Sequence, residues 1–238
     1  MAGKKTTRPG AESRTAAVRV KTARKRTISS TLWLERQLND PYVAEAGRLG
    51  YRSRAAFKLL QLDERFGLLR PGMRLVDLGA APGGWTQVAV ERIRPTETLG
   101  RVVGLDILEM APLPGADLML ADFLDETAPD RLRALLGGPA DLVLSDMAAP
   151  TTGHAGTDHL RITALAEAAY EFTYGVLSPG GAFVCKLFQG GAERELLQRL
   201  KRDFAQVRHA KPPASRADSS ETYLVATGFR AEGADHRD

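Results

Sequence analysis

The sequence contains little cysteine, little histidine and few aromatic residues. Its single cysteine, Cys185, excludes an internal disulfide framework, and the four histidines show none of the spacings that are typical of metal ligands. We therefore expect no metal site. Aromatic residues make up only 6% of the chain, and none of them forms a signature of stacking on single-stranded bases.

Long hydrophobic runs are also absent. No stretch approaches the roughly 18 apolar residues that a membrane span needs, and the N-terminal residues lack the apolar segment of a secretory signal. We expect a cytoplasmic protein without membrane contact. The length of 238 residues and the 43% content of hydrophobic residues fit one globular domain with a sizeable core.

Positive charge is concentrated at one end of the chain. Residues 1–27 contain nine of the 33 Lys and Arg residues but only one of the 29 acidic residues, so 24 basic and 28 acidic residues remain elsewhere. A segment of such polar composition cannot bury a hydrophobic core, so we expect this segment to be disordered when it is alone. It is either a solvated tail or an arm that binds nucleic acid through counterion release. The predicted organisation is an arm over 1–27, a single domain over 28–230 and a frayed tail over 231–238.

The most informative stretch is LVDLGAAPGGWTQ, residues 75–87, in which a strand pattern leads through a Gly-rich turn into a helix pattern. Gly79 and Gly83 remove Cβ atoms where a ligand approaches the backbone, and the helix start offers free N–H groups. Such a junction at the carboxyl edge of a parallel sheet binds nucleotides. The glycine spacing matches neither the G-x-G-x-x-G of dinucleotide enzymes nor a P-loop.

Three acidic residues accompany this turn. Asp77 lies in the strand before it, Asp106 ends the run 101–106, and Asp122 follows the run 118–121. At these strand ends, Asp106 can accept both ribose hydroxyls of an adenosyl group, and Asp122 can meet the adenine edge. The series favours S-adenosyl-L-methionine, because the sulfonium and amino groups of that cofactor are cationic and it needs no phosphate cradle.

Strand and helix patterns alternate after Pro71 and indicate an α/β fold. Strands are predicted near 74–79, 101–106, 117–121, 141–146, 181–188, 205–210 and 222–227, and helices near 84–93, 128–136, 158–176 and 191–203. Before them, helices are predicted from a cap at Ser30 or Thr31 to Gln37, over 41–49, and from a cap at Ser53 to Phe66. The alternation predicts a Rossmann-like fold with a seven-stranded, mostly parallel sheet and helices on both faces.

Charged residues within this pattern are candidates for chemistry. Lys186 lies in an apolar strand, where burial without a partner is costly, so it should have a task or a counter-charge. Cys185 should face the other side of the same strand as a small core residue. Lys58 lies at the edge of an apolar helix stripe, where an isolated lysine is usually a solvated surface residue. Asp146 ends a buried strand, and Glu221 opens the last one.

Several sequence blocks, in order, resemble one family. They are Tyr51–Leu59, Pro71–Met73, Asp77–Trp85, Ser145–Ala148, Lys186–Gly190, Ser215–Arg216 and Ser220–Tyr223. The chain resembles the RrmJ/FtsJ-type (RlmE) ribosomal RNA 2′-O-ribose methyltransferases from near Trp33 to Gly228. One departure follows Asp146, where the family often has Met-Ala-Pro-Asn and this chain has Met147-Ala148-Ala149-Pro150, which leaves the course of that loop open.

The resemblance implies a Lys-Asp-Lys-Glu constellation, which falls on Lys58, Asp146, Lys186 and Glu221. It implies cofactor contacts at Gly83, Trp85, Asp106, Asp122 and Asp146. The implied substrate is a uridine of the A-loop of large-subunit rRNA, presented within the assembled large subunit. Two alternatives stay open, a 2′-O-methyltransferase for tRNA or an mRNA cap, and a non-catalytic RNA-binding assembly factor.

The implied reaction needs a group that handles the proton of the ribose 2′-hydroxyl, and we assign it to Lys186. A lysine can act as a neutral base only where burial or a nearby cation lowers its pKa; otherwise it stabilises a developing alkoxide as an ammonium. We expect a monomer that recognises the RNA backbone and its shape more than its bases. Candidate phosphate contacts are Arg36, Arg48, Arg52, Arg54, Lys211 and Arg216.

Overall fold

The computed structural model describes residue 22 and residues 27–150, 152–188 and 193–230. The chain divides into two compact units, Met1–Ala44 and Glu45–Asp238. The first contains helix α1 (Ile28–Leu38) and the start of α2 (Pro41–Leu49). Residues 28–44 are predicted to belong to the main domain, but they fall in the first unit. The domain limits 28–230 stay a prediction. The tail 231–238 and most of the arm 1–27 lie outside the described residues.

The second unit is built on a seven-stranded sheet, as predicted. Its strands are β1 (Arg74–Leu78), β2 (Arg101–Asp106), β3 (Asp117–Leu120), β4 (Ala140–Ser145), β5 (Leu177–Phe188), β6 (Phe204–Ala210) and β7 (Glu221–Phe229). The strand order is β3-β2-β1-β4-β5-β7-β6. The first five strands in this order pair in parallel, and β7 runs antiparallel to both of its neighbours.

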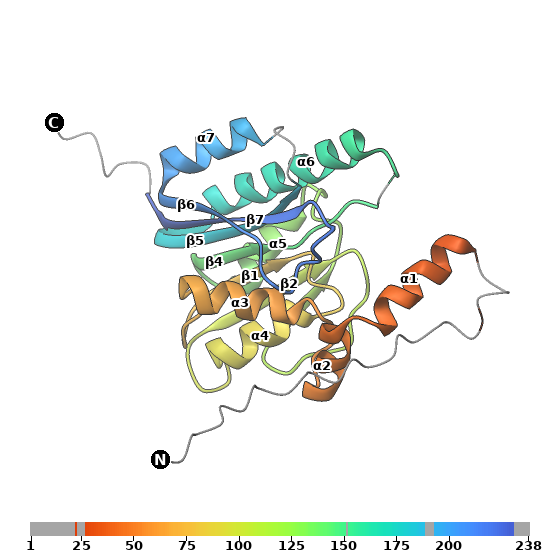
Figure 1. Ribbon diagram of the computed structural model, residues 1–238. Coiled ribbons are helices and arrows are strands. Elements are labelled where there is room, and N and C mark those ends of the chain that lie inside the picture. The colour runs from red at the N-terminus through yellow and green to blue at the C-terminus, as the bar shows by residue number, and fades with distance from the viewer. Residues whose placement is uncertain (1–21, 23–26, 151, 189–192, 231–238) are drawn as a thin grey trace, which may run out of the picture. The chain divides into compact units, whose positions relative to one another are not determined.

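Helices cover both faces of this sheet, because parallel strands need crossover connections. They are α3 (Ala56–Phe66), α4 (Gly84–Ile93), α5 (Ala128–Leu136), α6 (Ala155–Tyr174) and α7 (Arg194–Asp203). Figure 1 shows α3 and α4 on one face and α6 and α7 on the other. Each face has its own apolar core, one with α3 and α4 and the other with α5, α6 and α7.

Alternation along the strands decides which side chains meet which helices. On β5, Phe183 and Cys185 belong to the core under α6 and α7, whereas Val184 belongs to the core with α3 and α4. Lys186 therefore shares the α3 and α4 face. Cys185 faces away from it as predicted, and burial raises the pKa of its thiol to about 12. The same alternation on β7 places Tyr223 on the α3 face.

The starts of α1, α3, α6, α7 and β5 differ from the predicted starts by two residues or more. Helix α6 begins at Ala155, three residues before its predicted start, and α7 begins at Arg194, three residues after it. Helix α1 begins at Ile28, because the hydroxyl of Thr27 accepts the N–H of Ser30 at 3.2 Å and caps the helix earlier than predicted. Helix α3 begins at Ala56, three residues after the predicted cap at Ser53, and its cap Ala55 makes no side-chain hydrogen bond. Strand β5 begins at Leu177, and a register irregularity separates this first pairing from the pairing of Ala182 with β4.

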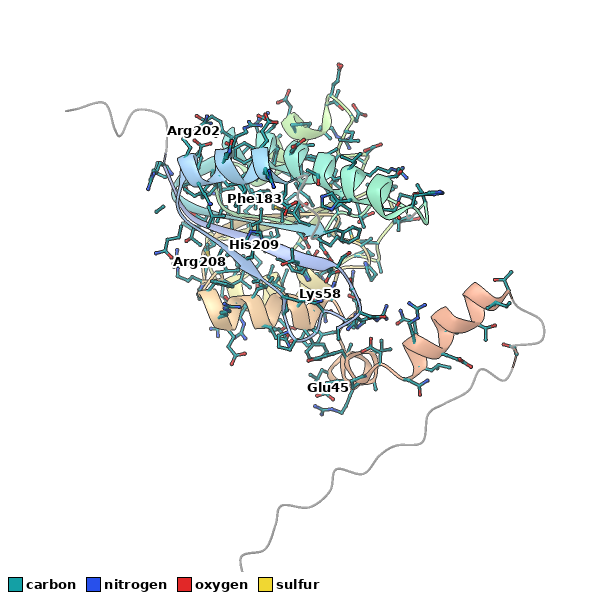
Figure 2. The ribbon with its side chains drawn as sticks, turned by 45° about the horizontal axis from the view of Figure 1, so that its top comes forward. Glu45, Lys58, Phe183, Arg202, Arg208 and His209 are labelled. Carbon is teal, nitrogen blue, oxygen red and sulfur yellow. The ribbon has the colours of Figure 1, made fainter. Side chains whose placement is uncertain are left out.

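The buried ring of Phe183 provides a test of the core beneath α6 and α7 (Figure 2). Phe183→Ala should lower the free energy of unfolding by about 3–5 kcal/mol, because it leaves a cavity in a close-packed layer. Urea denaturation measures the change. Leu99→Ala is the matched control, because Leu99 is 91% exposed and its truncation should change stability by less than about 0.5 kcal/mol. Equal effects of both substitutions would contradict this core.

Candidate active site

The turn between β1 and α4 requires glycine at two positions. Gly79 has a φ of +77°, and a Cβ there would lie 2.7 Å from the backbone N and Cα of Met147. Gly83 has a φ of +108°, and a Cβ there would lie 2.9 Å from Cδ of Arg52. At Gly79 both the backbone conformation and the neighbouring backbone exclude a side chain, whereas at Gly83 the positive φ disfavours one and the Arg52 side chain can move. The turn is therefore held between the loop after β4 and the segment before α3.

Asp77 lies directly beneath this turn and is fully buried. Its Oδ2 accepts a hydrogen bond from the hydroxyl of Thr86 at 2.7 Å, and within the described part of the chain its Oδ1 has no hydrogen-bond partner. Burial raises the pKa of Asp77 from its ordinary value of 3.8 to about 7, against the lowering effect of the Thr86 bond, and the negative charges of Asp146 and Asp106 add to the rise. Three carboxylates thus act on one small region, which favours a cationic ligand there.

Asp106 and Asp122 are oriented by their own loops. In Asp106, Oδ2 accepts the N–H of Ala81 at 2.8 Å and Oδ1 accepts the N–H of Leu108 at 2.9 Å. Asp122 is exposed, and its Oδ1 accepts the N–H of Leu124 at 2.9 Å. Asp106 is thereby fastened to the Gly-rich turn itself, whereas Asp122 is held only by the next turn along the chain.

Trp85, another predicted cofactor contact, has its side chain in the core. The indole is 2% exposed, its Nε1 donates to the carbonyl of Ala55 at 2.8 Å, and its ring packs on that of Tyr223 with 5.5 Å between centroids. The indole N–H is thus already used within the protein. The predicted contact at Trp85 therefore depends on the backbone of the turn, not on the indole.

A cluster of charged side chains lies on the α3 face of the sheet. The ammonium group of Lys58 is 2.7 Å from Oε1 and 2.8 Å from Oε2 of Glu221, and it donates to the hydroxyl of Tyr223 at 3.2 Å. That hydroxyl donates in turn to Oδ1 of Asp146 at 2.9 Å. The four side chains form one hydrogen-bonded series from α3 across β7 to the end of β4. Figure 2 shows Lys58 on α3.

Lys186 completes this series. Its Nζ lies 3.0 Å from Oδ1 of Asp146 and donates to the backbone carbonyl of the same residue at 2.6 Å. Lys58 and Lys186 are each 8% exposed, so the interpretation of Lys58 as a solvated surface lysine is wrong. The structure brings together all four residues of the constellation, with Tyr223 between the two ion pairs.

Strand register explains why residues far apart in the sequence meet here. Ser145 pairs with Cys185 in the parallel β4–β5 ladder, so the next residues, Asp146 and Lys186, follow side by side. In the antiparallel β5–β7 ladder, Lys186 pairs with Tyr223. Glu221 precedes Tyr223 by two residues and therefore lies on the same face. No sequence pattern predicts these pairings, because register depends on the assembled sheet.

The charges and the burial of this cluster shift the pKa values of Asp146 and Tyr223. Burial works to raise the pKa of Asp146, but the ammonium groups of Lys186 and Lys58 outweigh it and lower that pKa. Burial and the carboxylates of Asp146 and Glu221 raise the pKa of Tyr223 well above 10. Tyr223 therefore stays protonated and acts as a donor to Asp146. The sequence contained one signal for it, namely its place two residues after Glu221.

Several predicted RNA contacts have partners within the protein. Arg52 donates to the carbonyls of Ala111 and Pro112, both at 2.7 Å, and Arg54 donates to the carbonyl of Ala214. Lys211 donates to two carbonyls of its own loop. Arg48 pairs with Glu45 on α2, Arg36 is exposed on α1, and Arg216 is half-buried. Their binding to RNA stays a prediction.

Two features are absent from the part of the chain that the structure describes, a cluster of metal ligands and a membrane-spanning helix. In those residues, no group of three His, Cys, Asp or Glu side chains is arranged to hold a metal ion. Nor does any described helix combine the length and the apolar composition needed to cross a bilayer.

Arg52→Met should loosen the segment 107–116, because both guanidinium bonds to its carbonyls are lost. We expect amide hydrogen exchange in this segment to rise roughly three- to tenfold, the effect of losing about 1 kcal/mol of local stability. Hydrogen exchange with mass spectrometry measures it. Arg48→Met is the matched control, since Arg48 forms an ion pair with Glu45 three residues away on the same helix. Unchanged exchange in 107–116 of the Arg52 variant would contradict the role of this arginine.

Asp77→Asn should alter how stability depends on pH. Because the folded pKa of Asp77 is raised to about 7, the folded chain keeps a proton that the unfolded chain loses, and stability falls as pH rises from about 4 to 7. Asparagine can still accept the Thr86 bond but never ionises. The variant should therefore gain stability relative to the parent between pH 5 and 8, as thermal unfolding at both pH values will show. Parallel curves for the two proteins would refute the assignment, and exposed Asp117→Asn is the control.

Known proteins resemble this chain in sequence and in structure. A relative in Paramagnetospirillum magneticum, named Ribosomal RNA large subunit methyltransferase E, is 66% identical over 93% of this chain and 92% of its own length. A relative of the same name in Azorhizobium caulinodans is 62% identical over 92% and 91% of the two chains. A solved structure from Plasmodium falciparum, described as a candidate ribosomal RNA methyltransferase, shares 29% identity with a TM-score of 0.67 and covers 75% of this chain and 98% of its own.

A family model gives the same result over the compact unit that carries the site. The model described as FtsJ-like methyltransferase matches residues 51–229, which contain the Gly-rich turn and all four residues of the charged constellation. The chain therefore belongs to the FtsJ-like methyltransferase family.

Proposed function

We propose that this protein transfers the methyl group of S-adenosyl-L-methionine to the 2′-hydroxyl of a uridine ribose in the A-loop of 23S rRNA. The proposed substrate is the assembled large ribosomal subunit, and the proposed setting is the cytoplasm. The observation that carries the reaction is the Glu221–Lys58–Tyr223–Asp146–Lys186 series beside the Gly-rich turn. The relatives named Ribosomal RNA large subunit methyltransferase E support the substrate, and the family resemblance supports the uridine.

The residues around the turn fit this cofactor. Gly79 and Gly83 have no side chains that would occupy the space where a ligand approaches the turn. Asp106 presents a carboxylate that is hydrogen-bonded to the turn. The Oδ1 of Asp77, which has no hydrogen-bond partner among the described residues, and the charges of Asp106 and Asp146 create a negative region beneath the turn, while the Arg52 side chain lies beside Gly83 and donates to the carbonyls of Ala111 and Pro112. A sulfonium and an ammonium group would be stabilised there. When bound, the cofactor supplies an activated methyl group.

We assign to Lys186 the role of acting on the ribose oxygen. An ammonium group carries three N–H donors, and the carboxylate and carbonyl of Asp146 take two of them. We assign the third to the 2′-oxygen, whose negative charge develops as it attacks the methyl group. Lys186 and Lys58 lower the pKa of Asp146 despite its burial, so Asp146 is a carboxylate that accepts from Nζ of Lys186. These contacts favour Lys186 as an ammonium group that stabilises the developing alkoxide while the ribose proton passes to water, and not as a neutral base.

Lys58 and Glu221 have a supporting part in this proposal. Glu221 binds the Lys58 ammonium with both carboxylate oxygens, which fixes the second cation near Asp146. Tyr223 links the Lys58–Glu221 pair to Asp146, because its hydroxyl accepts a hydrogen bond from Lys58 and donates one to Asp146. Two cations and two anions balance within a poorly solvated space, so that removal of any one leaves an uncompensated charge.

Substitution of Lys186 tests the reaction and distinguishes its two roles. Lys186→Ala should lower transfer of a radiolabelled methyl group to purified large subunits by about 100- to 1,000-fold, the loss typical of one electrostatic stabiliser. Lys186→Arg should keep a measurable part of the activity, because arginine keeps the charge but cannot act as a base. Cofactor affinity, followed by calorimetry, should change little in either variant.

Three results would contradict parts of this proposal. Near-normal turnover by Lys186→Ala would remove the assignment of Lys186. An arginine variant as inactive as the alanine variant would favour the neutral base. Transfer to tRNA or capped mRNA in place of the large subunit, or ribose methylation of the A-loop that persists in cells without the gene, would refute the substrate.

A further inference from the structure

The loop between β6 and β7, residues 211–220, is an ordered element with its own internal bonds. Lys211 donates from Nζ to the carbonyl of Ala217 at 3.3 Å and to that of Ser219 at 2.6 Å. The N–H of Ser215 donates to the carbonyl of Pro212 at 2.8 Å and closes a tight turn. The Nζ of Lys211 thus provides hydrogen bonds for two backbone carbonyls of the loop.

The same loop is fastened to the helix that carries Lys58. The backbone N–H of Ala214 donates to Oε1 of Gln61 on α3 at 2.8 Å, and the carbonyl of Ala214 accepts from Arg54 just before that helix. Ala214 is fully buried. Both backbone groups of one residue are therefore held by the α3 segment, and the position of the next residue, Ser215, follows from it.

Ser215 connects this anchored loop to the charged cluster. Its side chain is almost fully buried, and its hydroxyl donates to Oε1 of Glu221 at 2.8 Å. The same oxygen lies 2.7 Å from the Lys58 ammonium. Hydrogen bonds to a carboxylate are among the stronger ones in proteins. With the hydroxyl in place, the Glu221 carboxylate cannot rotate without breaking a bond to Ser215 or to Lys58.

We propose that Ser215 is a positioning residue of the reaction. It fixes the Glu221 carboxylate, which places the Lys58 ammonium and, through Tyr223, orients Asp146 beside Lys186. This inference rests on the proposed function and extends it to a loop that the charged constellation does not include. The segment Arg54–Gln61 would then supply Lys58 to the cluster. Through its bonds to Ala214, it would also hold the loop whose Ser215 fixes Glu221, the partner of Lys58.

The first test compares two serines of the loop. Ser215→Ala should lower kcat for methyl transfer to large subunits by about tenfold, the value of one charge-assisted hydrogen bond, with the KM for S-adenosyl-L-methionine unchanged. Ser220→Ala is the matched control, because Ser220 lies in the same loop and is exposed. Parental kcat in the Ser215 variant would overturn the inference.

A double-mutant cycle separates positioning from general loop stability. If Ser215 acts through Glu221, Ser215→Ala should cause no further loss of kcat in a Glu221→Ala background. If the hydroxyl only stabilises the loop, the losses will be independent and will multiply. Equal fold-losses in the two backgrounds would therefore overturn the positioning role.

A structural readout makes the inference independent of the proposed reaction. A crystal structure of Ser215→Ala should show the Glu221 carboxylate turned and its Oε1 no longer within hydrogen-bond distance of Lys58. Retention of the 2.7 Å contact would overturn the positioning role even in a protein without the proposed activity. Absence of methyl transfer by the parental protein would instead refute the proposed function and leave this geometry to be judged by the crystal structure.

Discussion

A lysine ammonium group buried beside a sheet needs a carboxylate within hydrogen-bond distance, and this constraint organises the site. Lys58 and Lys186 both lose most of their contact with water, which costs several kcal/mol per ion in a poorly polar environment. Glu221 and Asp146 compensate them at 2.7 and 3.0 Å. Because Tyr223 links the two pairs, the four charges form one unit whose members depend on one another.

The carboxylates near the Gly-rich turn are not all paired with a cation in this way. Beneath the Gly-rich turn, Asp77 has one oxygen bonded to Thr86, and the other has no hydrogen-bond partner among the described residues. Asp106 and Asp146 add negative charge to it. The carboxyl edge of the sheet thus has a compensated part, near β5 and β7, and an anionic part, near β1 and β2. This division matches a reaction in which a cationic donor meets an oxygen that becomes negative.

Several basic residues of this chain have a structural role within the protein. Arg52, Arg54 and Lys211 all looked like phosphate ligands in the sequence, yet each donates to backbone carbonyls of a loop. Loops leave carbonyl groups without the partners that helices and strands provide, and long cationic side chains can satisfy them. An arginine next to an active site can therefore hold the loops that shape the pocket, whatever else it binds.

The sequence by itself determined the elements of the fold and the candidates for chemistry. Alternating apolar patterns placed every strand within a few residues, and the resemblance located Lys58, Asp146, Lys186 and Glu221. Both depend on local residue types and their spacing, which a sequence displays directly. The misplaced starts of α1 and β5 arose where a cap or a register irregularity competed with that local pattern.

Only the tertiary structure decided which charge meets which. Lys58 binds Glu221 across 163 positions of the chain, and Tyr223 bonds to Asp146 across 77. These pairings depend on the registers of β4, β5 and β7 and on the packing of α3 over them, and a shift of one residue would turn each side chain to the other face. The roles of Tyr223 and Ser215 follow from the same registers, because a hydroxyl group has no role until its neighbours are in place.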